Sequence, residues 1–310
     1  MNDFPRPSRL RPARTGSYAS TYIELRAMHA DGCLAKVGSG SGFFYRIAGR
    51  MFLVTCWHVL TGRNPDNVQR EMYQQPDVVV LYLPKKKKPE HFLPGIPIPL
   101  YNKGKPIWYE PRDLLGRVDL AMIPLENLNE AKVFAVNDHF EYHDIAFEPG
   151  KDVTIIGYPF GMQSNPFPIW KRAAIASEPG YTTLGKRVVL LDTPGRPGMS
   201  GAPIFFSAPG INVDRETAAA IKSGDVSRAS DMLLNLSPEA MGDSTVVLEF
   251  CGVYAGSYGD AELEKMNLGR MIPLDMVSLL LKEPKKGSNT NYNEPIIKLN
   301  LEAVFCEKPK

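Results

Sequence analysis

Short runs of apolar residues separated by polar turns recur along this 310-residue chain. Runs with the length and the β-branched and aromatic content of strands occur at residues 22–28, 42–47, 50–55, 78–83, 153–156, 188–191 and 202–206. Ala48-Gly49 between two of these runs is typical of a tight hairpin turn. Helical patterns are short, at residues 214–222, 226–236 and 273–282. The pattern predicts a mostly β protein.

Length and turn content indicate more than one β domain. The chain is too long for one small domain and can bury a sizeable core, and its 26 Gly and 27 Pro supply many turns. We expect an N-terminal β domain over residues 19–140 and a second over 141–283, which carries an insertion over 207–244. Residues 1–18 are expected to be a flexible arm and 284–310 a C-terminal extension.

Three residues with catalytic chemistry lie at the ends of predicted strands. His58 comes three residues after the strand 50–55, and Asp119 begins the apolar run 120–124. Ser200 lies in a glycine-containing turn just before another strand. The chain order histidine, aspartate, serine is that of one of the three unrelated Ser-His-Asp arrangements. The three residues are therefore candidates for a catalytic triad.

The chemistry of these residue types fits the roles. A serine hydroxyl needs a base to take its proton during attack, and an imidazole titrates in the right range to do so. A carboxylate on the other ring nitrogen holds the tautomer and stabilises the imidazolium. The developing oxyanion needs backbone N–H donors. We expect these donors to be Gly198 and Ser200, because glycine allows backbone angles that other residues avoid.

Six short motifs carry a resemblance to a known family, in that family's order. They are Ser41-Gly42-Phe43 with the run 53–59 around His58, Val118-Asp119-Leu120-Ala121, residues 155–161, Gly198-Met199-Ser200-Gly201, residues 251–256 and residues 269–273. The chain resembles the trypsin-like serine peptidases, in the bacterial branch that contains the HtrA proteases. The likeness covers roughly residues 20–283, and no PDZ-like module fits after it.

The resemblance implies a fold, an activity and a substrate site. The fold is all-β, with two antiparallel six-stranded barrels of the chymotrypsin type, the active site between them and a short C-terminal helix. The activity is hydrolysis of peptide bonds in proteins or peptides through an acyl-enzyme intermediate. The substrate pocket, transferred by position, is formed by Pro194, Gly195, Tyr254, Ala255, Gly256, Gly269 and Met271.

The pocket residues favour an uncharged substrate side chain. None of them is acidic, so a medium apolar side chain is expected before the cleaved bond. The strand 253–256 is expected to bind the substrate main chain by β-augmentation. Met199 stands where many secreted relatives carry an aspartate that pairs with a newly cut N-terminus. Activation by N-terminal insertion is therefore not expected.

Composition predicts a cytoplasmic protein. The N-terminus lacks the apolar segment of a signal peptide, and no apolar run approaches membrane-spanning length. Of the four cysteines, Cys56 and Cys251 lie in apolar strands, where buried free thiols are expected. A net charge of +2 without a basic face does not favour nucleic acid as a partner. The run Lys85-Lys86-Lys87-Lys88 is interpreted as a solvated loop, with a docking patch for an acidic partner as the alternative.

Several alternatives remain at this point. The insertion 207–244 is interpreted as a passive excursion, as a lid or as the contact for a regulatory partner. No cofactor and no metal site are expected, because Pro and Gly near His139 and His143 disfavour a helical ligand pair. A catalytically silent peptide-binding module of the same fold is the alternative function. An α/β-hydrolase esterase is disfavoured, since Ala202 follows Gly201 and the order of the triad differs.

Overall fold

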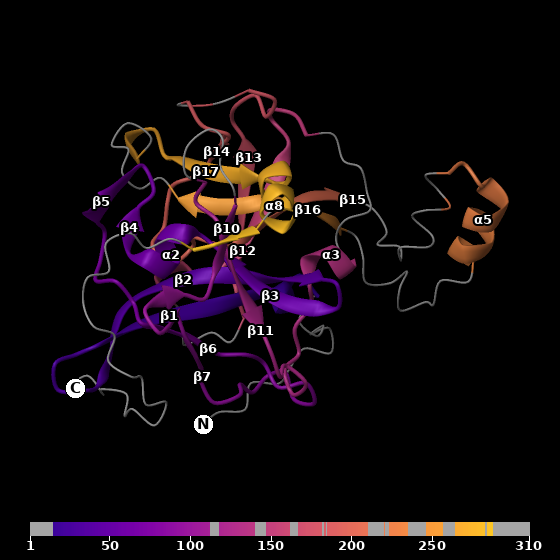
Figure 1. Ribbon diagram of the computed structural model, residues 1–310. Coiled ribbons are helices and arrows are strands. Elements are labelled where there is room, and N and C mark those ends of the chain that lie inside the picture. The colour runs from indigo at the N-terminus through magenta and orange to yellow at the C-terminus, as the bar shows by residue number, and fades with distance from the viewer. Residues whose placement is uncertain are drawn as a thin grey trace, which may run out of the picture.

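The computed structural model describes residues 15–111, 118–139, 147–161, 167–181, 183, 185–209, 220, 223–234, 246–256, 264–282 and 284–287. Within these ranges the chain forms two β units, the first from the N-terminal half with one strand from residues 284–286 and the second from the C-terminal half (Figure 1). The predicted fold class, a mostly β chymotrypsin-like double barrel, is confirmed.

The first unit is an antiparallel sheet of eight strands. Their order is β18-β10-β11-β3-β2-β1-β6-β7. The bounds are β1 Ser20–Met28, β2 Leu34–Ile47, β3 Arg50–Thr55, β6 Val78–Leu81, β7 Ile96–Pro99, β10 Tyr109–Pro111, β11 Ala121–Leu125 and β18 Pro284–Lys286. Two small hairpins accompany it, β4 Arg63–Asn64 with β5 Asn67–Glu71, and β8 Tyr101–Asn102 with β9 Lys105–Pro106.

Prolines lie on both edge strands of this sheet. Strand β7 contains Pro97 and Pro99, and β18 begins at Pro284. Proline cannot donate a ladder hydrogen bond, so it favours edges and strand starts. Since β7 and β18 do not pair with each other, the first unit is a curled, open sheet rather than the closed six-stranded barrel that was predicted for it.

The second unit is a closed barrel of six antiparallel strands, as predicted. The strands follow one another around the barrel in the order β12-β13-β14-β17-β16-β15. Their bounds are β12 Asp152–Gly157, β13 Ile169–Ile175, β14 Val189–Asp192, β15 Pro203–Pro209, β16 Val246–Gly256 and β17 Leu268–Pro273. In Figure 1 the barrel lies above the first sheet.

The described helices are short. They are α1 Gly16–Ala19, α2 Trp57–Thr61, α3 Val136–His139, the 3-10 turn η1 Pro159–Gly161, α5 Val226–Leu234 and α8 Leu274–Lys282. Helices α5 and α8 confirm two of the three predicted helical stretches; most of the third, 214–222, lies outside the described residues. Helix α5 stands apart from both β units in Figure 1. No described helix is both long and apolar enough to cross a membrane.

The predicted terminal segments are described only in part. Of the expected arm 1–18, the structure describes residues 15–18, and α1 there is buried. Of the expected extension 284–310, it describes residues 284–287, where β18 pairs with β10. His143 lies outside the described residues, as does most of the insertion 207–244.

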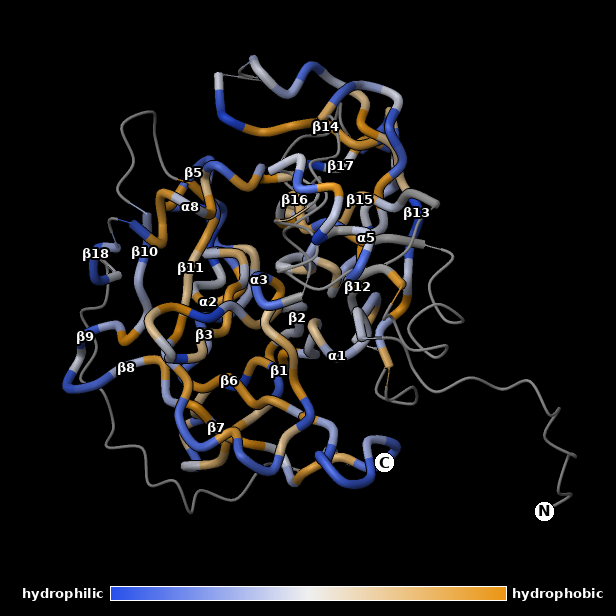
Figure 2. Tube along the Cα trace, turned by 90° about the vertical axis from the view of Figure 1, so that its right-hand side faces the viewer, coloured by the Kyte–Doolittle hydropathy of each residue, from blue (hydrophilic) through white to orange (hydrophobic). Residues whose placement is uncertain are grey.

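One apolar core is shared by the two units. The cluster that fills the first sheet also contains Phe205 and Phe250 of the barrel. The rings of Phe43 on β2 and Phe250 on β16 pack with their centroids 5.1 Å apart. A second cluster fills the barrel interior, and hydrophobic stretches concentrate on the strands of both units (Figure 2). The cleft between the units is thus framed by strands that pack against each other.

Candidate active site

His58 is fixed on the short helix that follows β3. Helix α2 ends at Thr61 and is capped by Gly62, whose φ of 69° is the left-handed conformation that favours glycine and whose N–H donates to the carbonyl of His58. The hydroxyl of Tyr73 donates to the carbonyl oxygens of His58 and Val59, at 2.6 and 3.0 Å. The His58 side chain is buried. Its backbone is therefore held from two sides.

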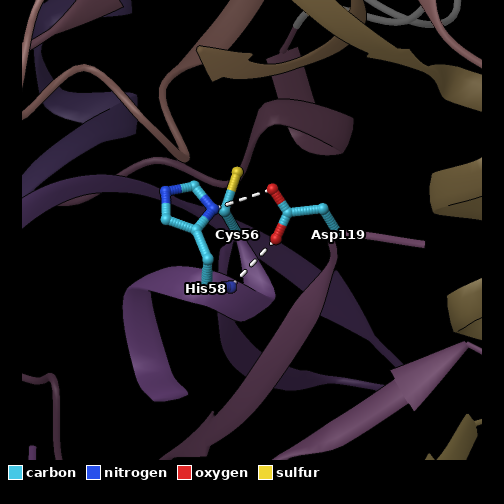
Figure 3. Close-up of side chains that lie close together, drawn as sticks. All are labelled: Cys56, His58 and Asp119. Carbon is cyan, nitrogen blue, oxygen red and sulfur yellow. Dashed lines mark hydrogen bonds and ion pairs between the residues drawn. The ribbon is translucent and has the colours of Figure 1, made fainter. Parts of the chain in front are cut away.

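Asp119 precedes β11, which pairs with β3, so the register of the sheet brings the carboxylate to His58. Oδ2 lies 2.8 Å from Nδ1 of His58, and Oδ1 accepts the backbone N–H of the same residue at 2.9 Å (Figure 3). An ionised carboxylate only accepts, so Nδ1 carries the proton in this contact. This leaves Nε2 as the nitrogen that does not face the carboxylate.

The turn around Ser200 requires its two glycines. Gly198 and Gly201 both have a φ of 87°. A Cβ on Gly198 would lie 2.5 Å from the carbonyl oxygen of Tyr158, and one on Gly201 would lie 2.1 Å from that of Ser41. Both the backbone angle and the close approach exclude larger residues. The turn thus presents Ser200 between two positions at which only glycine fits.

Ser200, Gly198 and His58 line one cavity of about 560 Å³ between the two units. Asp119 lies behind His58 and contacts its ring. The contact between a nucleophile hydroxyl and its base is often long without substrate and tightens in the reacting complex. The structure therefore brings the three predicted residues to one site, with the His58–Asp119 pair already formed.

The structure places three of the seven predicted pocket residues at the cavity. Pro194, Gly195 and Gly256 line the cavity. The other four predicted residues do not line it, namely Tyr254, Ala255, Gly269 and Met271. Tyr254 and Met271 are directly paired across β16 and β17 and both belong to the barrel core. Gly269 packs against the Tyr254 ring, where a Cβ would lie 2.7 Å from a ring carbon.

Two charged residues that the sequence pattern did not predict, Arg196 and Glu264, also line the cavity. Arg196, Glu264 and Asn267 line it on the barrel side, and Met72 and Tyr73 line it on the sheet side. Glu264 adds a carboxylate to the cavity lining that the residues transferred by position did not include. Arg196 stands two residues before Gly198, so its proximity was visible in the sequence. Glu264 precedes β17 in a segment that carries no recognisable motif.

Positive charge gathers behind the loop that precedes Ser200. The Lys171 ammonium donates to the carbonyl of Pro194. Burial, and next the nearby Arg196, lower the pKa of Lys171 below its usual range. The loop from Pro194 to Arg196 is therefore bordered by two cations.

Cys56 lies beside the catalytic candidates (Figure 3). The ligand atoms of Cys56, His58 and Asp119 lie within 4.8 Å of one another. Burial, and next the charge of Asp119, raise the pKa of the Cys56 thiol well above its usual range. Metal binding needs a thiolate, and Nδ1 of His58 already contacts Asp119. The cluster is therefore poorly suited to hold a metal ion.

The described cysteines differ in state. Cys56 and Cys251 are buried free thiols, as predicted. Cys33 is disulfide-bonded, which is more typical of an oxidising compartment. The cysteines therefore do not support the expected reducing cytoplasm.

A barrel and a curled sheet with a His-Asp pair and a serine turn in the cleft between them define a chymotrypsin-like fold. The family model of the trypsin-like peptidase domain matches residues 40–210, more than half of the chain. The chain therefore belongs to the trypsin-like peptidase family.

Comparison with solved structures finds a serine endoprotease from Yersinia pestis, 14% identical with a TM-score of 0.44. The match covers 86% of this chain and 62% of that one, so the chain spans less than two thirds of that protein. No curated protein sequence matches the chain.

Proposed function

We propose that the protein is a serine endopeptidase that hydrolyses peptide bonds in proteins or peptides through Ser200, His58 and Asp119. The observation that carries the proposal is the 2.8 Å contact between Nδ1 of His58 and Asp119, formed at a cavity that Ser200 also lines. The family supplies the substrate class, since its members are peptidases.

The residues act in two chemical stages. The Ser200 hydroxyl oxygen attacks the substrate carbonyl carbon while Nε2 of His58 takes its proton, and Asp119 stabilises the imidazolium through Nδ1. His58 then gives this proton to the leaving amine as the C–N bond breaks, which leaves an ester on Ser200. A water molecule attacks the ester, His58 again serves as base, and the Ser200 oxygen leaves with the proton from His58.

The oxyanion of both tetrahedral intermediates is bound by the N–H groups of Gly198 and Ser200. Both residues line the cavity, and neither N–H donates to another described residue. The intervening Met199 N–H is used differently, because it donates to the carbonyl of Arg196 at 3.2 Å. An oxyanion donor of this kind lowers the barrier by about 3 kcal/mol.

The substrate main chain runs past the end of β16, where Gly256 lines the cavity. This fits the expected binding along residues 253–256 by β-augmentation. The side chain before the cleaved bond is held next to Pro194 and Gly195, and we keep a medium apolar residue as its expected type. Cleavage of a peptide library tests this preference, and dominant cutting after Lys or Arg would contradict it.

A fluorophosphonate probe, which reacts with activated serines, tests the proposed activity. We expect the wild type to be labelled and Ser200→Ala to lose all labelling, with hydrolysis of an unstructured protein such as casein lost in parallel. A folded wild type that is neither labelled nor active would instead support the alternative, a catalytically silent peptide-binding module. Binding of library peptides without cleavage would then identify its ligands.

A further inference from the structure

We infer that Ser41, on the first β unit, is the positioning residue of the oxyanion hole on the second. The inference rests on the proposed function and adds to it a residue that does not touch the substrate. Ser41 lies on β2 and is fully buried. Its contacts reach both sides of the Gly198–Ser200 turn.

Four successive carbonyl groups of the turn each accept an identified hydrogen bond. Pro197 accepts from the N–H of Phe160 at 2.6 Å, and Met199 accepts from that of Ala202 at 3.0 Å. The two remaining carbonyls, those of Gly198 and Ser200, accept from Ser41: Gly198 from its hydroxyl at 2.7 Å and Ser200 from its N–H at 2.8 Å.

These carbonyl contacts fix where the donors point. In a trans peptide the C=O and the N–H point in opposite directions. The Pro197 carbonyl and the Gly198 N–H belong to one peptide group, so the hydrogen bond from Phe160 to that carbonyl turns the Gly198 N–H away from Phe160. In the same way, the hydrogen bond to the Met199 carbonyl orients the Ser200 N–H. The Gly198–Met199 peptide lies between these two donor peptides, and the Ser41 hydroxyl holds it. Ser41 thus sets the angle between the two donors.

Ser41 is itself held rigidly. Its hydroxyl accepts the N–H of Tyr158 at 2.9 Å while donating to Gly198, and its carbonyl accepts the Thr55 hydroxyl at 2.7 Å. A Cβ on Gly157 would approach the Ser41 hydroxyl oxygen to 2.9 Å. One buried hydroxyl therefore joins the nucleophile turn to the end of β12.

Ser41→Ala is the direct test. It removes the hydroxyl and leaves two buried polar groups, the Gly198 carbonyl and the Tyr158 N–H, without that partner. The measurement is the rate of fluorophosphonate labelling over a range of probe concentrations and pH. We expect the maximal rate, kinact, to fall roughly 10- to 100-fold, less than the roughly 100- to 1,000-fold lost when an oxyanion donor is removed outright. The half-saturating concentration, KI, and the pH profile should stay unchanged, since the His58–Asp119 contact is untouched.

The kinetics separate positioning from loss of folding. Circular dichroism and the melting temperature of the variant show whether it is folded under the labelling conditions. Slow labelling of a fully folded variant then identifies a misplaced oxyanion hole. Ser20→Ala is the matched control, because Ser20 is a buried serine on the adjacent β1 whose hydroxyl has no hydrogen-bond partner among the described residues. It should label like the wild type.

Ser41→Cys provides a second variant if Ser41→Ala does not fold. A thiol forms weaker and longer hydrogen bonds than a hydroxyl, so kinact should again be reduced. A folded Ser41 variant with wild-type kinact would overturn the positioning role and leave the peptidase intact. A folded wild type that is not labelled at all would overturn the proposed function itself, so the two failures are distinguishable.

Discussion

An ion network ties the two β units together beside the cleft, and its loss is predicted to be measurable. Asp66 lies in the turn between β4 and β5 of the first unit. Its carboxylate contacts Lys186, and it accepts from Arg270 of β17 at 2.8 Å. The Arg270 side chain is only 6% exposed, so its charge depends on partners within the protein. Asp66→Asn removes the negative charge and keeps the size of the side chain.

The expected loss follows from the burial of the two partners. Breaking a fully buried ion pair costs about 3–5 kcal/mol. The Asp66 side chain is 31% exposed, and Arg270 keeps a further contact, so water and that contact offset much of the cost. We expect Asp66→Asn to lower the free energy of unfolding by about 1–2 kcal/mol. The melting temperature at pH 7 should then fall by roughly 2–5 °C.

The pH dependence provides a sharper test. Burial acts to raise the pKa of Asp66, but hydrogen bonds and charge from Lys186 and Arg270 outweigh it and hold the pKa below its usual range. A carboxyl whose pKa is lower in the folded state stabilises the folded protein at pH values above its unfolded-state pKa of about 3.9. This stabilisation is lost as the pH falls through the folded-state pKa.

Thermal unfolding of wild type and Asp66→Asn from pH 7 down to pH 3 is the assay. The difference in melting temperature should narrow as the pH falls. Asp152→Asn is the control. Asp152 and Arg172 form an exposed ion pair between two strands of the barrel, so this pair does not link the two β units. A difference that is absent at pH 7, or equally large at pH 3, would refute the reasoning.

Two further predictions concern the serine turn and the buried thiols. Gly198→Ala should abolish fluorophosphonate labelling while the protein still folds, because the new Cβ would lie 2.5 Å from the Tyr158 carbonyl oxygen. Labelling and circular dichroism measure these two outcomes, and a labelled variant would contradict the tight turn. Cys56 and Cys251 should resist iodoacetamide in the native protein and react after denaturation. Burial is the largest cause of the raised pKa of both thiols. Mass spectrometry after timed alkylation measures this, and rapid native modification would refute it.

The sequence predicted the parts of the fold that depend on local pattern. Strand β3, the Ala48-Gly49 turn and helix α8 lie where the apolar runs and turn residues indicated. The open first sheet was not predicted. Prolines at Pro97 and Pro284 are visible in the sequence, but their places at opposite edges depend on which strands pair.

The candidate site was predictable where motif and chain order carry it. His58, Asp119 and Ser200 follow from residue type and order, and the structure places them together. The substrate wall was less predictable, because neighbouring strand residues face opposite sides and Tyr254 faces the barrel core. Ser41 could be seen as part of a motif, yet its hydroxyl meets Gly198, 157 residues later, only in the folded chain.

The core shared by the two units has a consequence for how this site can change. Because Phe43 and Phe250 pack across the boundary, the units cannot shift apart without exposing both rings. The two sides of the cleft are therefore held together by buried apolar packing. Arg196 and Glu264 line the cavity outside that core, so substitutions there leave the packing between the units intact. The packed β units thus form the constant part of the site, and the residues that line the cavity are the part open to engineering.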